Sequence, residues 1–111
     1  MKRILATGFV TLALMGAMIV PASAHLERGV NCHFDDVSTR SGERVHVEIR
    51  ITNRSSDTHR NACVVKIRTN THHLLVTSSC SLPPNTFCVR RYTVVVPGVF
   101  RFARIIHAHV L

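Results

Sequence analysis

Hydrophobic and polar residues alternate strictly along residues 44–53 of this chain. The aliphatic side chains of Val45, Val47, Ile49 and Ile51 occupy every second position, and charged or polar residues lie between them. A period of two is typical of a strand with one buried face and one solvated face. The segment therefore predicts a half-buried β-strand.

Similar but shorter patterns occur in the rest of the chain. Further strands are expected at 30–34, 62–69, 74–79, 87–96 and 99–111, and the last of these ranges has room for two. Polar or proline-containing breaks separate them at 53–61, 70–73, 81–85 and 97–98. Because no stretch keeps a 3.6-residue period, the chain is predicted to be all-β, a small antiparallel β-sandwich of six to seven strands.

The first 24 residues carry one apolar run instead of alternation. Lys2 and Arg3 precede the apolar segment 4–20, and Ala22-Ser23-Ala24 follows as a small-residue cleavage site. These are the three parts of a signal peptide, here of bacterial type. An uncleaved anchor is the alternative, and it is disfavoured because the run is marginal for about 30 Å of hydrocarbon.

Cleavage after residue 24 would leave one domain, residues 25–111, without stable membrane insertion. The expected location is periplasmic or secreted, and such compartments are oxidising. All four cysteines lie in this domain: Cys32, Cys63, Cys80 and Cys88. Their wide spacing differs from the close pairs of structural zinc sites, so two disulfides are predicted.

Several turn and strand signals resemble bacterial immunoglobulin-like modules of the CARDB type and the fibronectin-III-like type. They include Thr52-Asn53-Arg54-Ser55 after a strand, a cysteine-bearing strand, Leu82-Pro83-Pro84-Asn85-Thr86 before a valine-rich strand, and Pro97-Gly98 before the last strand. The resemblance implies a non-enzymatic binding or spacer module and no shared catalytic residues. This chain departs from those modules in its four cysteines and many histidines.

On a sandwich with strands running alternately up and down, all four cysteines fall at one end. The favoured pairing joins Cys80 to Cys88 across the proline turn and Cys32 to Cys63 between the two sheets. Chain entropy makes these bonds worth roughly 2.6 and roughly 3.7 kcal/mol. The alternative, Cys63–Cys80 with Cys32–Cys88, stays open at this stage.

Eight histidines lie between residues 25 and 109, which raises the question of metal binding. His107 and His109 are two apart on a predicted strand, so both point to one face and could share an ion. Cleavage would also free the amine of His25 beside its own imidazole. The Ala24-His25-Leu26 start is similar to that of periplasmic copper-binding sandwiches of the CopC family, although the rest of that pattern is absent. Copper or zinc is therefore a candidate ligand.

The charge is the second candidate signal. The whole chain carries a formal +8, and the 12 Lys and Arg against 6 Asp and Glu of residues 25–111 leave +6. Eleven of these twelve are arginine, which binds carboxylates and phosphates bidentately. The expected contact residues for an unknown protein or an anionic envelope component are Arg44, Arg50, Arg90, Arg91, Arg101 and Arg104.

Two other classes are disfavoured. Nucleic acid is a poor partner because the chain has one Tyr and no Trp to stack on bases. Catalysis is disfavoured because no nucleophile motif such as G-x-S-x-G is present. Asp35 and Asp36 are adjacent, but neighbouring strand residues face opposite ways, so their carboxylates are expected not to converge without a turn. The chain is predicted not to be an enzyme.

Overall fold

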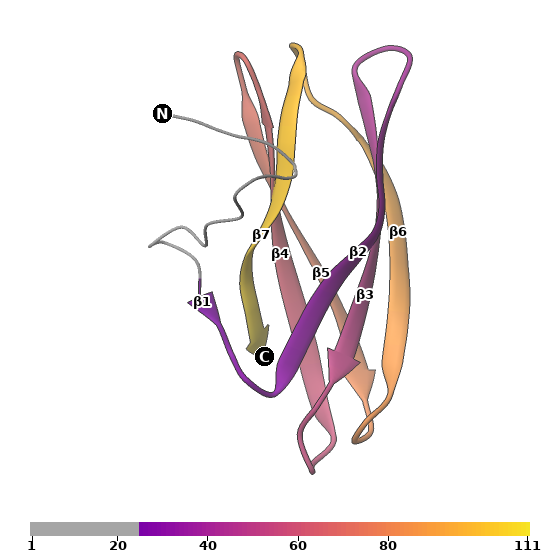
Figure 1. Cartoon of the computed structure of the whole chain (residues 1–111), viewed down its shortest axis with the longest axis vertical. Helices are drawn as coiled ribbons and strands as arrows, with labels where there is room; N and C mark the ends of the chain where they lie inside the picture. The colour runs from indigo at the N-terminus through magenta and orange to yellow at the C-terminus, as the bar shows by residue number, and fades with distance from the viewer. Residues whose placement is uncertain (1–24) are drawn as a thin grey trace.

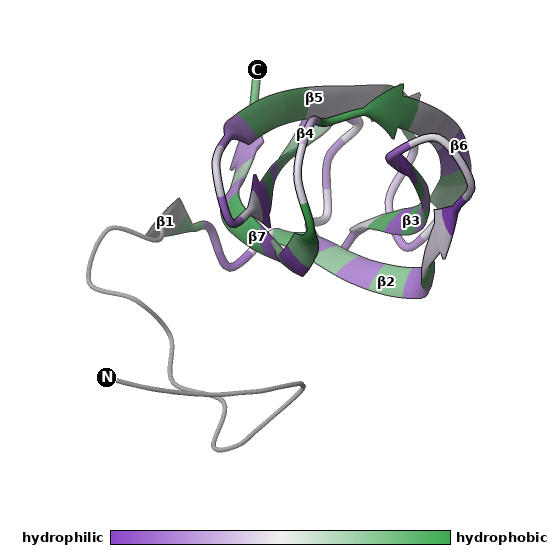
Figure 2. Cartoon of the chain, turned by 90° about the horizontal axis from the view of Figure 1, so that it is seen from above, coloured by the Kyte–Doolittle hydropathy of each residue, from purple (hydrophilic) through white to green (hydrophobic). Residues whose placement is uncertain are grey.

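Seven strands account for most of the residues that the computed structural model describes, which are 25–111; the predicted export signal lies outside them. They are labelled in Figure 1: β1 (His25–Leu26), β2 (Val30–Arg40), β3 (Arg44–Asn53), β4 (His59–Thr69), β5 (His73–Leu82), β6 (Phe87–Val95) and β7 (Phe100–Val110). Sheet A has the order β1-β7-β4-β5, and sheet B has the order β2-β3-β6. The two sheets face each other and enclose the core, as the end-on view of Figure 2 shows. The all-β sandwich is confirmed.

Every neighbouring pair of long strands within a sheet is antiparallel, and only the two-residue β1 runs parallel to its neighbour β7. Several strands are longer than their hydropathy indicates. β2 continues to Arg40, six residues past the expected end, because a β-bulge at Asp35 lets pairing resume beyond the two aspartates. The range 99–111 forms one strand rather than two, with register shifts near each end.

The core comes mainly from the central strand of each sheet. β3 contributes Val45, Val47, Ile49 and Ile51, all at most 2% exposed, as its alternation predicted. β4 contributes Cys63, Val65 and Ile67 to the core cluster, and none of them has exposed surface. A central strand has neighbours on both edges and a sheet over its inner face, so its inward side chains lose all contact with water.

A buried asparagine shortens the loop between β3 and β4. Asn53 is 0% exposed, and its Nδ2 donates to the carbonyl oxygens of Asp57 and Leu82 at 2.8 and 2.9 Å. Its Oδ1 accepts from the backbone N–H and the hydroxyl of Ser55 at 2.9 and 2.7 Å. These bonds satisfy the buried amide. They also fold residues 54–58 tightly enough for β4 to begin at His59, three residues before its expected start.

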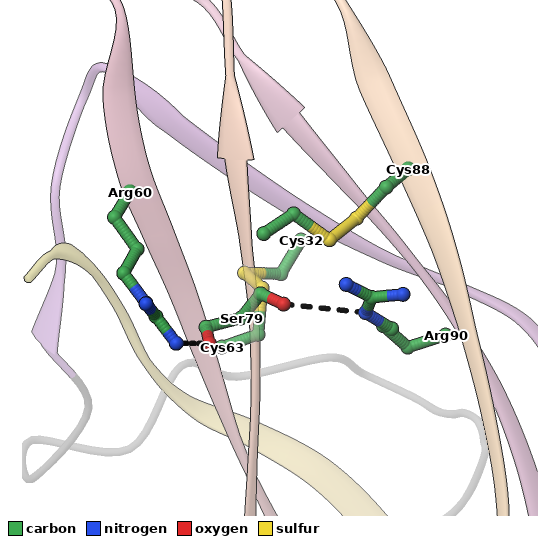
Figure 3. The surroundings of a disulfide bond; sticks show 7 residues. Cys32, Arg60, Cys63, Ser79, Cys88 and Arg90 are labelled. Carbon is green, nitrogen blue, oxygen red and sulfur yellow. Dashed lines mark hydrogen bonds between the residues drawn. A yellow bond between two sulfur atoms is a disulfide. The ribbon is translucent and has the colours of Figure 1, made fainter.

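Both disulfides bridge the two sheets at the same end of the sandwich. Cys32 of β2 is bonded to Cys63 of β4, and Cys80 of β5 is bonded to Cys88 of β6, with Cα–Cα distances of 6.1 and 6.6 Å. Figure 3 shows these two bonds close together. The favoured pairing is confirmed, and the alternative pairing is excluded. Cys32 and Cys88 both lie opposite Ile51 of β3, which explains why the bonds are neighbours.

Hydrogen bonds close the opposite end. The hydroxyl of Thr69, a residue 1% exposed, donates to the carbonyl of Pro97 at 2.6 Å and accepts from the N–H of His72. Gly98 has φ +106°, and a Cβ there would overlap the side-chain oxygens of Asn70 and Thr71. Only glycine fits this close approach. The Pro97-Gly98 turn is thereby held against the β4–β5 turn.

The single tyrosine of the chain lies on the inward side of β6. Tyr92 is opposite Val47 and packs against the core, and its hydroxyl has no hydrogen-bond partner among the described residues. Burial raises its pKa from 10 to about 12 because the phenolate would lose its hydration. The ionised form is therefore disfavoured in the folded state.

Removing each disulfide should show their unequal effect on stability. We expect Cys32→Ser/Cys63→Ser to lower the free energy of unfolding by roughly 3.7 kcal/mol and Cys80→Ser/Cys88→Ser by roughly 2.6, because the first bond closes the longer loop. Urea unfolding of the two variants and of the unaltered protein measures both losses. A larger loss from the Cys80/Cys88 variant would contradict the loop-length argument.

Alkaline titration should report on Tyr92 alone, since no other tyrosine absorbs. The tyrosinate absorbance is expected to rise with a midpoint near 12 in the folded protein and near 10 in urea. Because the unfolded chain ionises first, stability is unaffected below pH 10 and falls between pH 10 and 12. The Tyr92→Phe variant should not show this contribution to the fall in stability. A folded-state midpoint near 10 would contradict a raised pKa for Tyr92.

Candidate functional site

Charged residues are distributed very unequally between the two sheets. The strands of sheet B carry five Arg and three acidic residues, Asp35, Asp36 and Glu48. The strands of sheet A carry five Lys or Arg and no Asp or Glu. The net positive charge of the described residues is therefore concentrated on sheet A.

The outer face of sheet B is a network of opposite charges. A guanidinium nitrogen of Arg50 lies 3.3 Å from Oδ2 of Asp35, and Nε of Arg91 lies 3.3 Å from Oε2 of Glu48. His46 reaches the same Glu48 oxygen at 3.5 Å. All five ion pairs among the described residues lie on this face. Two of its arginines, Arg50 and Arg91, are therefore paired with carboxylates.

The two adjacent aspartates contribute to this network against expectation. Asp35 contacts Arg50, and Oδ2 of Asp36 lies 3.9 Å from Nε2 of His46, which is on the same outward side of β3. The bulge at Asp35 inserts one residue into β2 and so turns both carboxylates to the outer face. The expectation that they face opposite ways is wrong because it assumed a regular strand.

The six arginines predicted as one contact surface belong to three different places. Arg44, Arg50 and Arg91 are on the outer side of sheet B, whereas Arg101 and Arg104 are on β7 of sheet A. Arg90 occupies an inward register position opposite Ile49, and its Nε donates to the carbonyl of Ser79 at 3.2 Å, as Figure 3 shows. That bond spans the gap between the edges of β5 and β6. Neighbouring arginines separate because successive strand residues face opposite ways.

A different set of basic residues gathers on the outer side of sheet A. We call it the basic face: Arg60, Lys66 and Arg68 of β4 with Arg104 of β7. Lys66 and Arg68 alternate with the buried Val65 and Ile67, so they point outward. The hydrogen bonds of Arg60 and Arg68 go to neutral acceptors, the Ser79 hydroxyl (Figure 3) and the Thr69 carbonyl.

Arg104 is the most enclosed member of the basic face. It lies directly opposite Lys66 in the register of β7 and β4, and its guanidinium is 4.6 Å from the ring centre of Phe102. Its Nε is buried and has no hydrogen-bond partner among the described residues. Desolvation by burial lowers the pKa of Arg104, although an arginine remains charged at neutral pH. This cation is supported by an aromatic ring and no carboxylate.

The distribution of acidic residues along the sequence indicates where the basic face lies, which the positions of the arginines alone did not. Every acidic residue lies between 27 and 57, and residues 58–111 contain none. Three of the four long strands drawn from that acid-free segment, β4, β5 and β7, assemble into sheet A. Glu27 lies outside the strands of sheet A, and its carboxylate accepts from the N–H of Val110 of β7 at 2.6 Å.

The three histidines proposed as metal ligands meet at one edge of sheet A. His107 and His109 lie on its outer side with ring centres 6.2 Å apart and an interplanar angle of 85°. The parallel pairing of β1 with β7 places the Cα of His25 opposite that of His107. The side chain of His25 lies outside the description. Among the side chains described, no three His, Cys, Asp or Glu residues are arranged to hold a metal ion.

Comparisons with family models, with curated proteins and with solved structures find no match to this chain. Residues 25–111 include no helix with the length and hydropathy needed to cross a membrane. The two disulfides indicate an oxidising compartment, because such bonds rarely persist in a reducing cytosol.

Proposed function

We propose that this chain is an exported, non-enzymatic binding or accessory protein of the bacterial envelope, built on an immunoglobulin-like sandwich. Counted over the six long strands, the first, second and fifth share sheet B, and the third and sixth share sheet A. Strands A, B, E and strands C, F are divided in the same way in immunoglobulin domains. The disulfides support export, and the signal-like segment 1–24 would direct it.

The observation that carries this proposal is the segregation of charge onto the basic face. Sheet B pairs Arg50 and Arg91 with carboxylates, while the four cations of the basic face have no carboxylate on any strand of their sheet. Positive charge that the fold leaves uncompensated on one surface favours association with an anionic partner. The inter-sheet disulfides hold β4, the strand that carries three of these cations, in a rigid position.

Co-sedimentation with a bacterial cell-envelope fraction tests the proposal, using protein purified from cells that express the full chain. We expect binding that weakens with salt because the contacts are electrostatic. Lys66→Gln/Arg68→Gln should reduce it strongly. The matched control Arg50→Gln/Arg91→Gln removes the same charge from sheet B and should change the binding little, because both residues are already paired with carboxylates. The proposal fails if the unaltered protein stays in the supernatant.

A second candidate is a copper or zinc protein that uses His25, His107 and His109. The β1–β7 pairing favours it, since it brings the predicted new N-terminus beside the two imidazoles of β7. Two neighbouring imidazoles with a free amine would supply nitrogen ligands suited to either metal. The basic face on the same sheet repels a cation, and for this reason the metal function ranks second.

Titration with Cu²⁺ and Zn²⁺ tests the second candidate, on protein whose N-terminal residue has been shown by sequencing to be His25. The expected result is one tight site, weakened at least about tenfold by His25→Ala or by His107→Ala because each removes a ligand. His46→Ala is the control, since His46 lies on sheet B. Equal affinity in all four proteins would rule the site out.

A further inference from the structure

The basic face contains a pair of like charges at directly opposite positions of two neighbouring strands. Lys66 and Arg104 are direct cross-strand partners on β4 and β7, so their Cβ atoms are about 5 Å apart. Like charges in this position repel each other, and no Asp or Glu of sheet A offsets the repulsion. An anionic group with several oxygens could accept from both cations at once. Phosphate has this property and is bound readily by Lys and Arg.

The cations are spread along the strand rather than gathered around a hollow. Arg60 and Arg68 are eight residues apart on β4, which corresponds to roughly 27 Å of extended strand. The cavity of about 430 Å³ found among the described residues lies elsewhere, beside Arg44, Val96 and Phe100. A small free anion would contact only part of such a row. A surface that displays many phosphates could contact all of it.

Apolar side chains are interleaved with these cations. Leu75 of β5 lies directly opposite Lys66 and is 53% exposed, and Phe102 of β7 lies directly opposite Arg68. Both therefore share the outer side of sheet A with the basic face. Basic residues beside an exposed leucine and a half-buried phenylalanine are the combination by which proteins bind at the surface of anionic membranes. A purely polar polyanion would make no use of Leu75.

We infer that the basic face docks peripherally on an anionic phospholipid surface, with lipid phosphates between Lys66, Arg68 and Arg104 and with Leu75 and Phe102 against the headgroup region. This inference rests on the proposed function and names its partner. The sandwich stays folded outside the hydrocarbon, and only side chains of sheet A touch the lipid. Arg60 extends the contact along β4 toward the disulfide end.

Vesicle sedimentation tests this inference directly, with phosphatidylcholine vesicles compared with vesicles that also contain phosphatidylglycerol. We expect the protein to bind only the anionic vesicles. Each lost cation should weaken binding about fivefold, so Lys66→Gln/Arg68→Gln should lose about 25-fold. The matched control Arg50→Gln/Arg91→Gln should lose less than about twofold, because both of its cations already pair with carboxylates. Leu75→Ser should weaken binding without changing the charge.

A thermal unfolding curve for each variant separates lost contacts from lost folding. If Lys66→Gln/Arg68→Gln unfolds, Arg60→Gln/Arg68→Gln replaces it, since both of those residues are exposed. If the sheet A variant and the sheet B control lose the same amount of vesicle binding, the assignment to sheet A is overturned, because binding would then depend on net charge alone.

The envelope experiment separates this inference from the function on which it rests. Binding to the envelope fraction that survives protease treatment of that fraction would support lipid as the partner. Binding that disappears after protease treatment, with no binding to anionic vesicles, would overturn the lipid inference and leave the proposed envelope function standing. If neither the envelope nor the vesicles bind the protein, both proposals are wrong.

Discussion

The two-residue alternation of β4 is the constraint on which the rest of the structure depends. Its inward residues, Cys63, Val65 and Ile67, supply the centre of the core and one half of a disulfide. Its outward residues, Lys66 and Arg68, supply half of the basic face. A slip of one residue would exchange the two sets and bury the charges. The Cys32–Cys63 bond opposes such a slip because it attaches β4 to the facing sheet.

The arginines of the two sheets contact different kinds of neighbour. In sheet B a β-bulge brings two aspartates to the outer surface, where Arg50 and His46 contact them. In sheet A no acidic residue is available on any strand, and Arg104 stacks on Phe102 instead. The result is a domain in which one sheet carries acidic partners for part of its basic charge and the other sheet carries none. This asymmetry, more than the total charge, argues for a partner and for the side on which it binds.

Much of the fold could be predicted from the sequence, and the reasons are local. The strand 44–53 has the predicted bounds because its alternation is complete. The order of the strands brought four cysteines to one end and favoured the observed pairing, and the structure then excluded the alternative. The lengths of β2 and β4 were underestimated. β2 is extended by a bulge at Asp35, and β4 is extended by the buried hydrogen bonds of Asn53. Both features depend on contacts between segments and do not appear in the alternation of hydrophobic and polar residues.

The sequence by itself determined the all-β class and the positions of the breaks between strands. It also determined which segments carry charged residues, including the absence of acidic residues after residue 57. Only the tertiary structure decided which charges face one another. Ion pairing depends on strand order and register, and these join residues as distant as Lys66 and Arg104 while separating Arg90 from Arg91. The physical reason is that the pleat of a strand determines locally on which side of the sheet a side chain lies. The residues that it contacts there depend on the pairing of strands that are distant in sequence.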